Sequence, residues 1–223
     1  GKSHFLKILS YLLENRKVSG KSALEFFESK ISDSDILTTI EKSVRTGTKD
    51  VILFNIDSKS GETSERIVDI LMRVFNEKRG YFPDVFWIAE LEERLEEKGL
   101  YQKFKDAIAE ISGEPWEEVR TRYTFEQDDI IEALDRCVFQ SKESSERMFE
   151  SDGQNYILTP EKFAQKVKRY CEARGRDHQV IFLIDEIGQY IGDNSQLMLN
   201  LQTATEELGT ILKGKAWIIV TSQ

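Results

Sequence analysis

A short apolar run that ends in two adjacent carboxylates constrains the fold of this chain more than any other feature. Residues Val180 to Ile184 are all apolar, and Asp185 and Glu186 follow them directly. A run this short and this apolar is typical of a strand buried on both faces of a parallel sheet. Ligands of such sheets collect at the carboxyl ends of the strands, where both carboxylates would stand. The alternative interpretation is a core strand that is simply followed by polar residues and binds no ligand.

The first residues of the chain complement this strand. Gly1, Lys2, Ser3 and His4 open an amphipathic helix with apolar residues at helical spacing. Gly-Lys-Ser is the second half of the pattern G-x-x-x-x-G-K-[ST], the phosphate-binding loop. In such a loop the helix N-terminus and the Lys hold phosphates, and the hydroxyl ligates Mg²⁺. The two ends of the chain therefore predict an α/β fold with a parallel-sheet P-loop NTPase core.

The strand with the two carboxylates then has a defined place in that core. In P-loop NTPases it is the Walker B element, whose Asp holds Mg²⁺ and whose following acidic residue orients the attacking water. We therefore expect Ser3 and Asp185 to bind the metal and Glu186 to polarise water. Gly1, Lys2, Ser3 and His4 are expected to bind ATP.

The phosphate-binding pattern is incomplete. Its leading Gly, its variable residues and the strand that feeds it do not precede Gly1. We therefore expect a fragment that begins in the middle of the loop, with a core incomplete at its N-terminus. A sheet that lacks this strand leaves backbone groups unpaired. The isolated segment is expected to fold poorly and to bind nucleotide weakly, and a nanomolar affinity for ATP would contradict this.

A second Gly-Lys-Ser, at Gly20, Lys21 and Ser22, serves as a control for the first. The leading Gly of the pattern would fall at Asn15, and the residues between are polar where a buried strand should stand. We predict a turn and a helix N-terminus here instead of a second phosphate site.

Two other apolar runs also end in polar residues. Residues 51–57 read as a buried strand with Asn55 near its carboxyl end, and residues 216–220 read as another that ends at Thr221 and Ser222. The order of strand, helix and strand, with polar residues at the strand ends, resembles that of the AAA+ or closely related branch of P-loop ATPases. The resemblance implies that Asn55 pairs with Glu186 and holds it inactive, and that Thr221 or Ser222 senses the γ-phosphate. A polar residue merely satisfied at a strand end is the alternative for Asn55.

The resemblance becomes more specific near the C-terminus. Residues 182–193, 197–203, 206–209 and 213–223, together with residues 1–7, are similar to the large P-loop ATPase of BREX phage-defence systems, of the BrxC or PglY type. This implies a bacterial cytoplasmic ATPase that forms a homo-oligomer and works with other BREX proteins, including a DNA methyltransferase. Contact with DNA would be direct or through those partners. The resemblance also implies an arginine finger from an adjacent subunit, which one sequence does not identify.

A predominantly helical block separates the two halves of the predicted core. We expect residues 1–61 to form the first part of the NTPase core, 62–175 a helical insertion, and 176–223 the part from Walker B to sensor 1. One or two strand-helix units of about 30 residues suffice to bring the two motifs together, so most of the block is surplus. Within it, the polar stretch 140–155 is the expected mobile loop.

The composition of the chain argues against several classes of function and of site. The 223 residues carry 31 basic and 40 acidic side chains, a net charge of −9, which argues against a nonspecific nucleic-acid binder. No stretch reaches the roughly 18 apolar residues of a membrane span, so no membrane contact is expected. Cys137 and Cys171 lack metal or redox spacing and are expected to be reduced core thiols. His4 and His178 offer no metal-ligand spacing either.

The function predicted from the sequence is that of an ATP-binding and ATP-hydrolysing module, with ATP and Mg²⁺ as its ligands. It would couple nucleotide state to assembly with defence partners or DNA. Two alternatives remain open. One is a slow signalling ATPase that acts as an oligomerisation switch, and the other is a scaffold that binds nucleotide without useful turnover.

Overall fold

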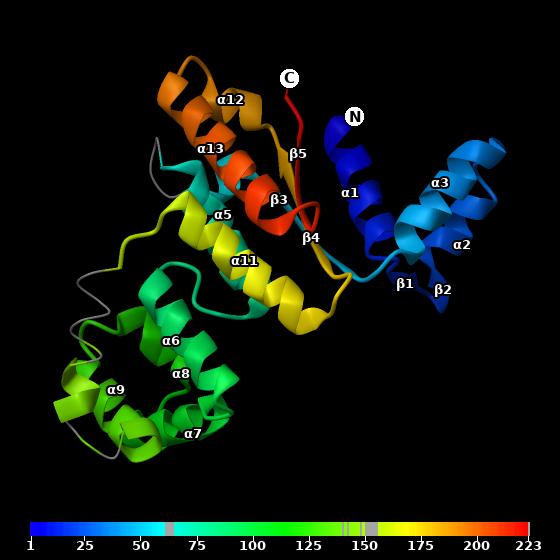
Figure 1. Cartoon of the computed structure of the whole chain (residues 1–223). Coiled ribbons are helices and arrows are strands. Elements are labelled where there is room, and N and C mark those ends of the chain that lie inside the picture. The colour runs from blue at the N-terminus through cyan, green and yellow to red at the C-terminus, as the bar shows by residue number, and fades with distance from the viewer. Residues whose placement is uncertain (61–64, 140, 142, 148, 150–155, 223) are drawn as a thin grey trace. The chain divides into compact units, whose positions relative to one another are not determined.

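The computed structural model describes residues 1–60, 65–139, 141, 143–147, 149 and 156–222 (Figure 1). It is a mixed α/β structure whose contacts divide it into two compact units. A sheet-bearing unit comprises Gly1–Val74 and Leu158–Gln223, and a helical unit comprises Phe75–Ile157. Helix α5 (Ile67–Arg79) contributes residues to both.

A parallel sheet of three strands forms the centre of the sheet-bearing unit. The strands are β3 (Lys49–Asn55), β4 (Gln179–Asp185) and β5 (Ala216–Val220), in the order β3-β4-β5. Asn55 pairs with Asp185 and Ile184 pairs with Val220, so the carboxyl ends of all three strands meet at one edge. β4 is central and almost entirely buried. The predicted parallel sheet and its three strands are therefore confirmed, except that the strand expected over 51–57 ends at Asn55 and a short helix begins at Ile56.

Helices cover both faces of this sheet because β4 is apolar on both sides. α1 (Lys2–Leu13) lies on the face that presents Val51, Ile181 and Leu183, and its Leu6 joins their cluster. α11 (Pro160–Arg174) and α13 (Ser195–Leu212) pack on each other and on the opposite face, where Phe163 meets Phe182. Figure 1 shows α1 on one side of the strands and α11 and α13 on the other.

The second Gly-Lys-Ser lies outside the sheet, as predicted. It lies at the turn and in the second strand of a short antiparallel hairpin, formed by β1 (Lys17–Val18) and β2 (Lys21–Ser22). Helix α2 (Ala23–Glu28) follows directly. Ser22 is the N-cap of α2, and its hydroxyl and the Glu25 carboxylate form a capping box. The hydroxyl is thereby engaged in capping the N-terminus of α2. α3 (Ser34–Arg45) follows and packs against α1 and α2.

A polar cluster around the buried His178 links the amino ends of β3 and β4. Its Nδ1 lies 2.7 Å from the Thr48 hydroxyl, and its Nε2 lies 3.3 Å from the Asp50 carboxylate. The Tyr170 hydroxyl donates to the same carboxylate. Burial lowers the pKa of His178 and raises the pKa of Tyr170 to about 12, so both groups are uncharged near neutral pH. The cluster joins β3, β4 and α11 at the end of the sheet away from Asp185.

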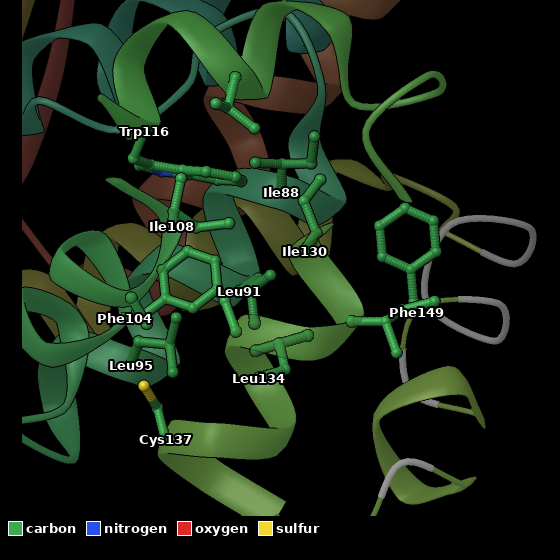
Figure 2. Packing of buried hydrophobic residues seen from close by; sticks show 14 of the residues in the cluster. Ile88, Leu91, Leu95, Phe104, Ile108, Trp116, Ile130, Leu134, Cys137 and Phe149 are labelled. Carbon is green, nitrogen blue, oxygen red and sulfur yellow. The ribbon is translucent and has the colours of Figure 1, made fainter. Parts of the chain in front are cut away.

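The helical unit has its own hydrophobic core. Its helices are α6 (Phe86–Glu97), α7 (Tyr101–Ser112), α8 (Trp116–Val119), the 3₁₀ turn η1 (Arg120–Arg122), α9 (Gln127–Leu134) and the π-helical turn η2 (Asp135–Phe139). Figure 2 shows Phe104 beside Trp116, whose rings meet edge to face with centroids 5.0 Å apart, and Cys137 at the side of the same core. Cys137 and Cys171 are both buried free thiols, as predicted.

A fully buried carboxylate, Glu92, organises the polar interior of this unit. Its Oε1 accepts hydrogen bonds from the Tyr101 hydroxyl at 2.8 Å, and from Trp116 Nε1 and Arg120 Nη1 at 2.7 Å each. Its Oε2 accepts from the backbone N–H of Phe82 at 2.6 Å. Because these donors come from separate segments, one side chain ties together α6, α7, α8 and the turn after α5. The aromatic residues Trp87, Phe104 and Trp116 are buried in the hydrophobic core of the same unit.

The structural division differs in extent from the predicted 62–175 insertion, since Val74 and Leu158 fall within the sheet-bearing unit. Part of the predicted loop 140–155 lies outside the described residues. Residues 143–147 within it are helical. Across the part of the chain that the structure describes, no helix has the length and apolar character needed to span a membrane.

Candidate functional site

Residues from four elements meet at the carboxyl edge of the sheet. They are Lys2 and Ser3 at the start of α1, Asn55 at the end of β3, Asp185 and Glu186 at the end of β4, and Thr221 and Ser222 after β5. The link across the edge is direct, because the N–H of Thr221 donates to the carbonyl of Ile184 at 2.9 Å. The sequence placed these residues at strand and helix ends, and the structure brings them together.

Asp185 is the acidic centre of this edge. The residue is 8% exposed, the Thr221 hydroxyl donates to its carboxylate, and the Ser3 hydroxyl lies within hydrogen-bonding reach of it. These hydrogen bonds, that of Ser3 foremost, hold the pKa of Asp185 below its usual range. An ionised carboxylate beside a Ser hydroxyl is a pair of hard oxygen donors, and Mg²⁺ is commonly bound by one or two such groups together with water and substrate phosphates. The residues present therefore fit the predicted metal pair.

Glu186 stands in a backbone conformation that non-glycine residues seldom adopt. Its φ is 63°, in the left-handed region, and it is the N-cap of the short helix α12 (Ile187–Ile191). Its N–H donates to the Thr221 hydroxyl at 3.3 Å, and the N–H of Ile187 donates to the Thr221 carbonyl at 3.1 Å. A left-handed residue costs roughly 1 to 2 kcal/mol and persists where its surroundings hold it, often at functional sites.

The Glu186 side chain is held by Asn55. The Asn55 Nδ2 donates to Glu186 Oε2, while its Oδ1 accepts from the N–H of Asp57 at 3.0 Å. Asn55 is thereby the N-cap of α4 (Ile56–Lys59), and this cap fixes which way the amide faces. The predicted contact between Asn55 and Glu186 is present. Its regulatory role stays a prediction.

Lys2 and Ser3 lie in the first turn of a twelve-residue helix, where backbone N–H groups and a positive dipole favour anions. The Lys2 ammonium donates to the carbonyl of Ser222, so it stands at the tip of β5. His4, also predicted to bind nucleotide, is exposed and is not brought into contact with Asp185 or Glu186 among the described residues.

Thr221 and Ser222 have different surroundings, a distinction that the sequence left open. The Thr221 hydroxyl is engaged by Asp185 and by the N–H of Glu186. Ser222 packs on α12 so closely that a Cβ on Gly188 would lie 2.0 Å from its Oγ. Only glycine fits at position 188 while β5 keeps this tip. Because of this close approach, Ser222 lies against the first turn of α12, directly after Glu186.

A groove of about 490 Å³ lies elsewhere on the sheet-bearing unit. It runs between α1 and α3 toward the amino ends of the strands, with Leu9, Leu13, Trp217 and Ile219 on its apolar walls and Lys42 at its rim. None of the residues that meet at the carboxyl edge lines it. The groove is therefore separate from the candidate site.

The chain matches no model of a known protein family, and none of the solved structures matches it. Within the described residues, no group of three or more His, Cys, Asp and Glu side chains gathers in the manner of a protein-only metal site. A metal held by one carboxylate, one hydroxyl and substrate oxygens does not require such a group.

The sequence did not reveal the residues that set the shape of this edge. Thr221 bridges Asp185 and the Glu186 backbone, and Gly188 lets β5 approach, yet neither relation follows from spacing along the chain. The glycine two residues after the carboxylate pair was the available signal, because glycine often marks a close approach of backbone to another segment.

Proposed function

We propose that this chain is the nucleotide-binding part of an ATPase of the P-loop class, and that its carboxyl edge binds ATP with Mg²⁺. The observation that supports this most is the convergence of Lys2, Ser3, Asp185 and Glu186 from opposite ends of the chain. A helix N-terminus with a Lys, a hydroxyl beside an ionised Asp, and a second carboxylate are the groups that phosphoryl transfer to water requires.

In this proposal each side chain has one task. Lys2 and the N-terminal N–H groups of α1 hold the β- and γ-phosphates, and Ser3 and Asp185 would hold Mg²⁺. The metal, when bound, neutralises charge on the phosphate oxygens. Glu186 accepts a hydrogen bond from the attacking water and orients it toward the γ-phosphate. Thr221 keeps Asp185 and the Glu186 backbone in register with β5.

The contact between Asn55 and Glu186 favours slow basal turnover. An amide that donates to the carboxylate competes with water for the same oxygen. The oligomerisation switch is therefore the second candidate function, since it needs a site that binds ATP but hydrolyses it slowly. A scaffold that binds nucleotide without turnover is the third candidate function. It gives no role to Glu186, which is the feature that argues against it.

The cellular role is proposed on the sequence resemblance alone. The similarity of residues 182–193 and 213–223 to the BREX ATPase supports a bacterial antiviral role, in a homo-oligomer that works in the cytoplasm with a DNA methyltransferase and other BREX proteins. DNA would be reached directly or through those partners. Stimulation of turnover by duplex DNA would favour a motor over a switch.

The two Gly-Lys-Ser segments provide a matched test of nucleotide binding. In the full-length protein, Lys2→Ala is expected to weaken MgATP binding by roughly 10- to 100-fold, because a charge-assisted hydrogen bond to phosphate contributes about 1.5 to 3 kcal/mol. Lys21→Ala, in the hairpin that precedes α2, should leave the affinity unchanged. Calorimetric titration measures both. Equal effects of the two substitutions, or none, would contradict the proposal.

A further inference from the structure

Three polar residues behind the carboxyl edge form a connection that the proposed chemistry does not use. The Arg73 guanidinium makes a two-pronged ion pair with the Glu65 carboxylate, at 2.8 and 2.7 Å. Arg73 Nη1 also donates to the carbonyl of Lys59 at 2.9 Å. The Tyr190 hydroxyl donates to the carbonyl of Glu65 at 2.9 Å. We call Glu65, Arg73 and Tyr190 the polar bracket.

The bracket is well enough enclosed to hold its geometry. The side chains of Arg73 and Glu65 are 19% and 16% exposed, so solvent screens their ion pair less than it would a surface pair. The pairing is bidentate, which adds directional restraint to the attraction. Burial raises the pKa of Tyr190, so its hydroxyl remains a donor across the physiological range.

The bracket joins the two short helices, α4 and α12, that begin at the carboxyl edge of the sheet. Lys59 is the last residue of α4, which Asn55 caps, and Tyr190 lies in α12, which begins directly after Glu186. The two helices also pack against each other. A closed ring of contacts thus runs from Glu186 to Asn55, along α4, through the bracket, and back along α12.

We propose that Arg73 and Tyr190 are positioning residues that keep Asn55 against Glu186 and so restrain hydrolysis. This inference rests on the proposed function of the edge and identifies how that site is regulated. Arg73 lies in α5, the helix whose later residues enter the helical unit.

Whether loss of the bracket raises or lowers the rate of hydrolysis depends on the contacts that hold the Glu186 backbone. Its backbone is fixed to β5 through the Thr221 hydroxyl and carbonyl, at 3.3 and 3.1 Å. Loosening the bracket leaves those bonds intact and frees the carboxylate from Asn55. A residue that merely stabilised the fold would lower turnover when removed, whereas a restraining residue raises it.

Tyr190→Phe removes one hydroxyl and tests the inference by steady-state kinetics on the full-length protein. We expect kcat to rise about three- to tenfold, the factor that one lost hydrogen bond produces, with KM for ATP unchanged. Tyr11→Phe, on a partly exposed tyrosine of α1, is the matched control and should leave kcat unchanged. An unaltered or lowered kcat in Tyr190→Phe, with the control normal, would overturn the inference.

Two further variants separate restraint from damage. Arg73→Gln should raise kcat as Tyr190→Phe does, and Arg73→Lys should restore part of the restraint because it keeps the charge without the two-pronged geometry. In an Asn55→Ala background, Tyr190→Phe should have no additional effect, since both act through one contact. Full additivity of the two substitutions would contradict a shared path.

A readout independent of turnover keeps the inference distinct from the proposed function. Hydrogen exchange at the Asp57 and Gly192 amides, bonded to Asn55 Oδ1 and the Gly188 carbonyl, should quicken about tenfold in Tyr190→Phe. Exchange in β4 should not change. If the wild-type protein neither binds nor hydrolyses ATP, the proposed function fails by itself. Unaltered exchange in α4 and α12 would overturn the bracket itself.

Discussion

Glu186→Gln is expected to lower kcat for ATP hydrolysis by about 10²- to 10⁴-fold, the usual contribution of a positioned general base. The amide is nearly the same size as the carboxylate but cannot accept a proton from water. Binding should survive, because Lys2, Ser3 and Asp185 hold the nucleotide in the proposal and none of them is altered. The variant should therefore trap bound ATP, which filter binding and single-turnover kinetics measure together.

Glu206→Gln, on an exposed glutamate of α13, is the matched control and should hydrolyse ATP at the wild-type rate. The pair of variants also separates the three candidate functions. A motor or switch loses its turnover with Glu186, and the two differ in the wild-type rate and in its response to DNA. A scaffold shows no turnover to lose and keeps its partner binding. Undiminished hydrolysis by Glu186→Gln would remove this residue from the mechanism.

Glu92→Ala is expected to have the largest effect on stability, about 3 to 5 kcal/mol in the free energy of opening of the helical unit. The carboxylate is completely buried and pairs with Arg120, whose side chain is 14% exposed. Its removal leaves that guanidinium and the donors of Tyr101 and Trp116 without their acceptor. A buried donor without a partner costs about 1 to 3 kcal/mol, and a charged one costs more.

Hydrogen exchange at the amides of α6 and α7 measures this opening without assuming that the whole chain unfolds in one step. Glu97→Ala lies in the same helix on an exposed residue and should change the exchange free energy by less than about 0.5 kcal/mol. Glu92→Gln should fall between the two, since it keeps an acceptor but removes the charge. A loss below about 1 kcal/mol for Glu92→Ala would show that the network relaxes without its centre.

The elements of the sheet were predictable because their signals are local. A run such as Val180 to Ile184 is a strand in almost any context that can bury both faces, and parallel strands place their polar ends at one edge. The register then pairs Asn55 with Asp185, so the end of β3 is level with the end of β4. The turn and helix N-terminus at the second Gly-Lys-Ser were also predicted from neighbouring residues.

What the sequence did not reveal depends on contacts between distant segments. The choice between Thr221 and Ser222 required the register of β5 against β4, which sets one hydroxyl on Asp185 and packs the other on α12. Arg73 stood as one charged residue within an apolar helical run, a pattern equally typical of a solvated helix face. Its partners, Glu65 and the carbonyl of Lys59, become apparent only in the folded structure.

The most direct test of the central claim is a structure of the full-length protein with Mg²⁺ and a non-hydrolysable ATP analogue. We predict the γ-phosphate beside Lys2 and the tip of β5, with Mg²⁺ between the Ser3 hydroxyl and the Asp185 carboxylate. Glu186 should face the γ-phosphate across one water. An analogue bound elsewhere, or a carboxyl edge that stays free of nucleotide at saturating concentration, would contradict the account.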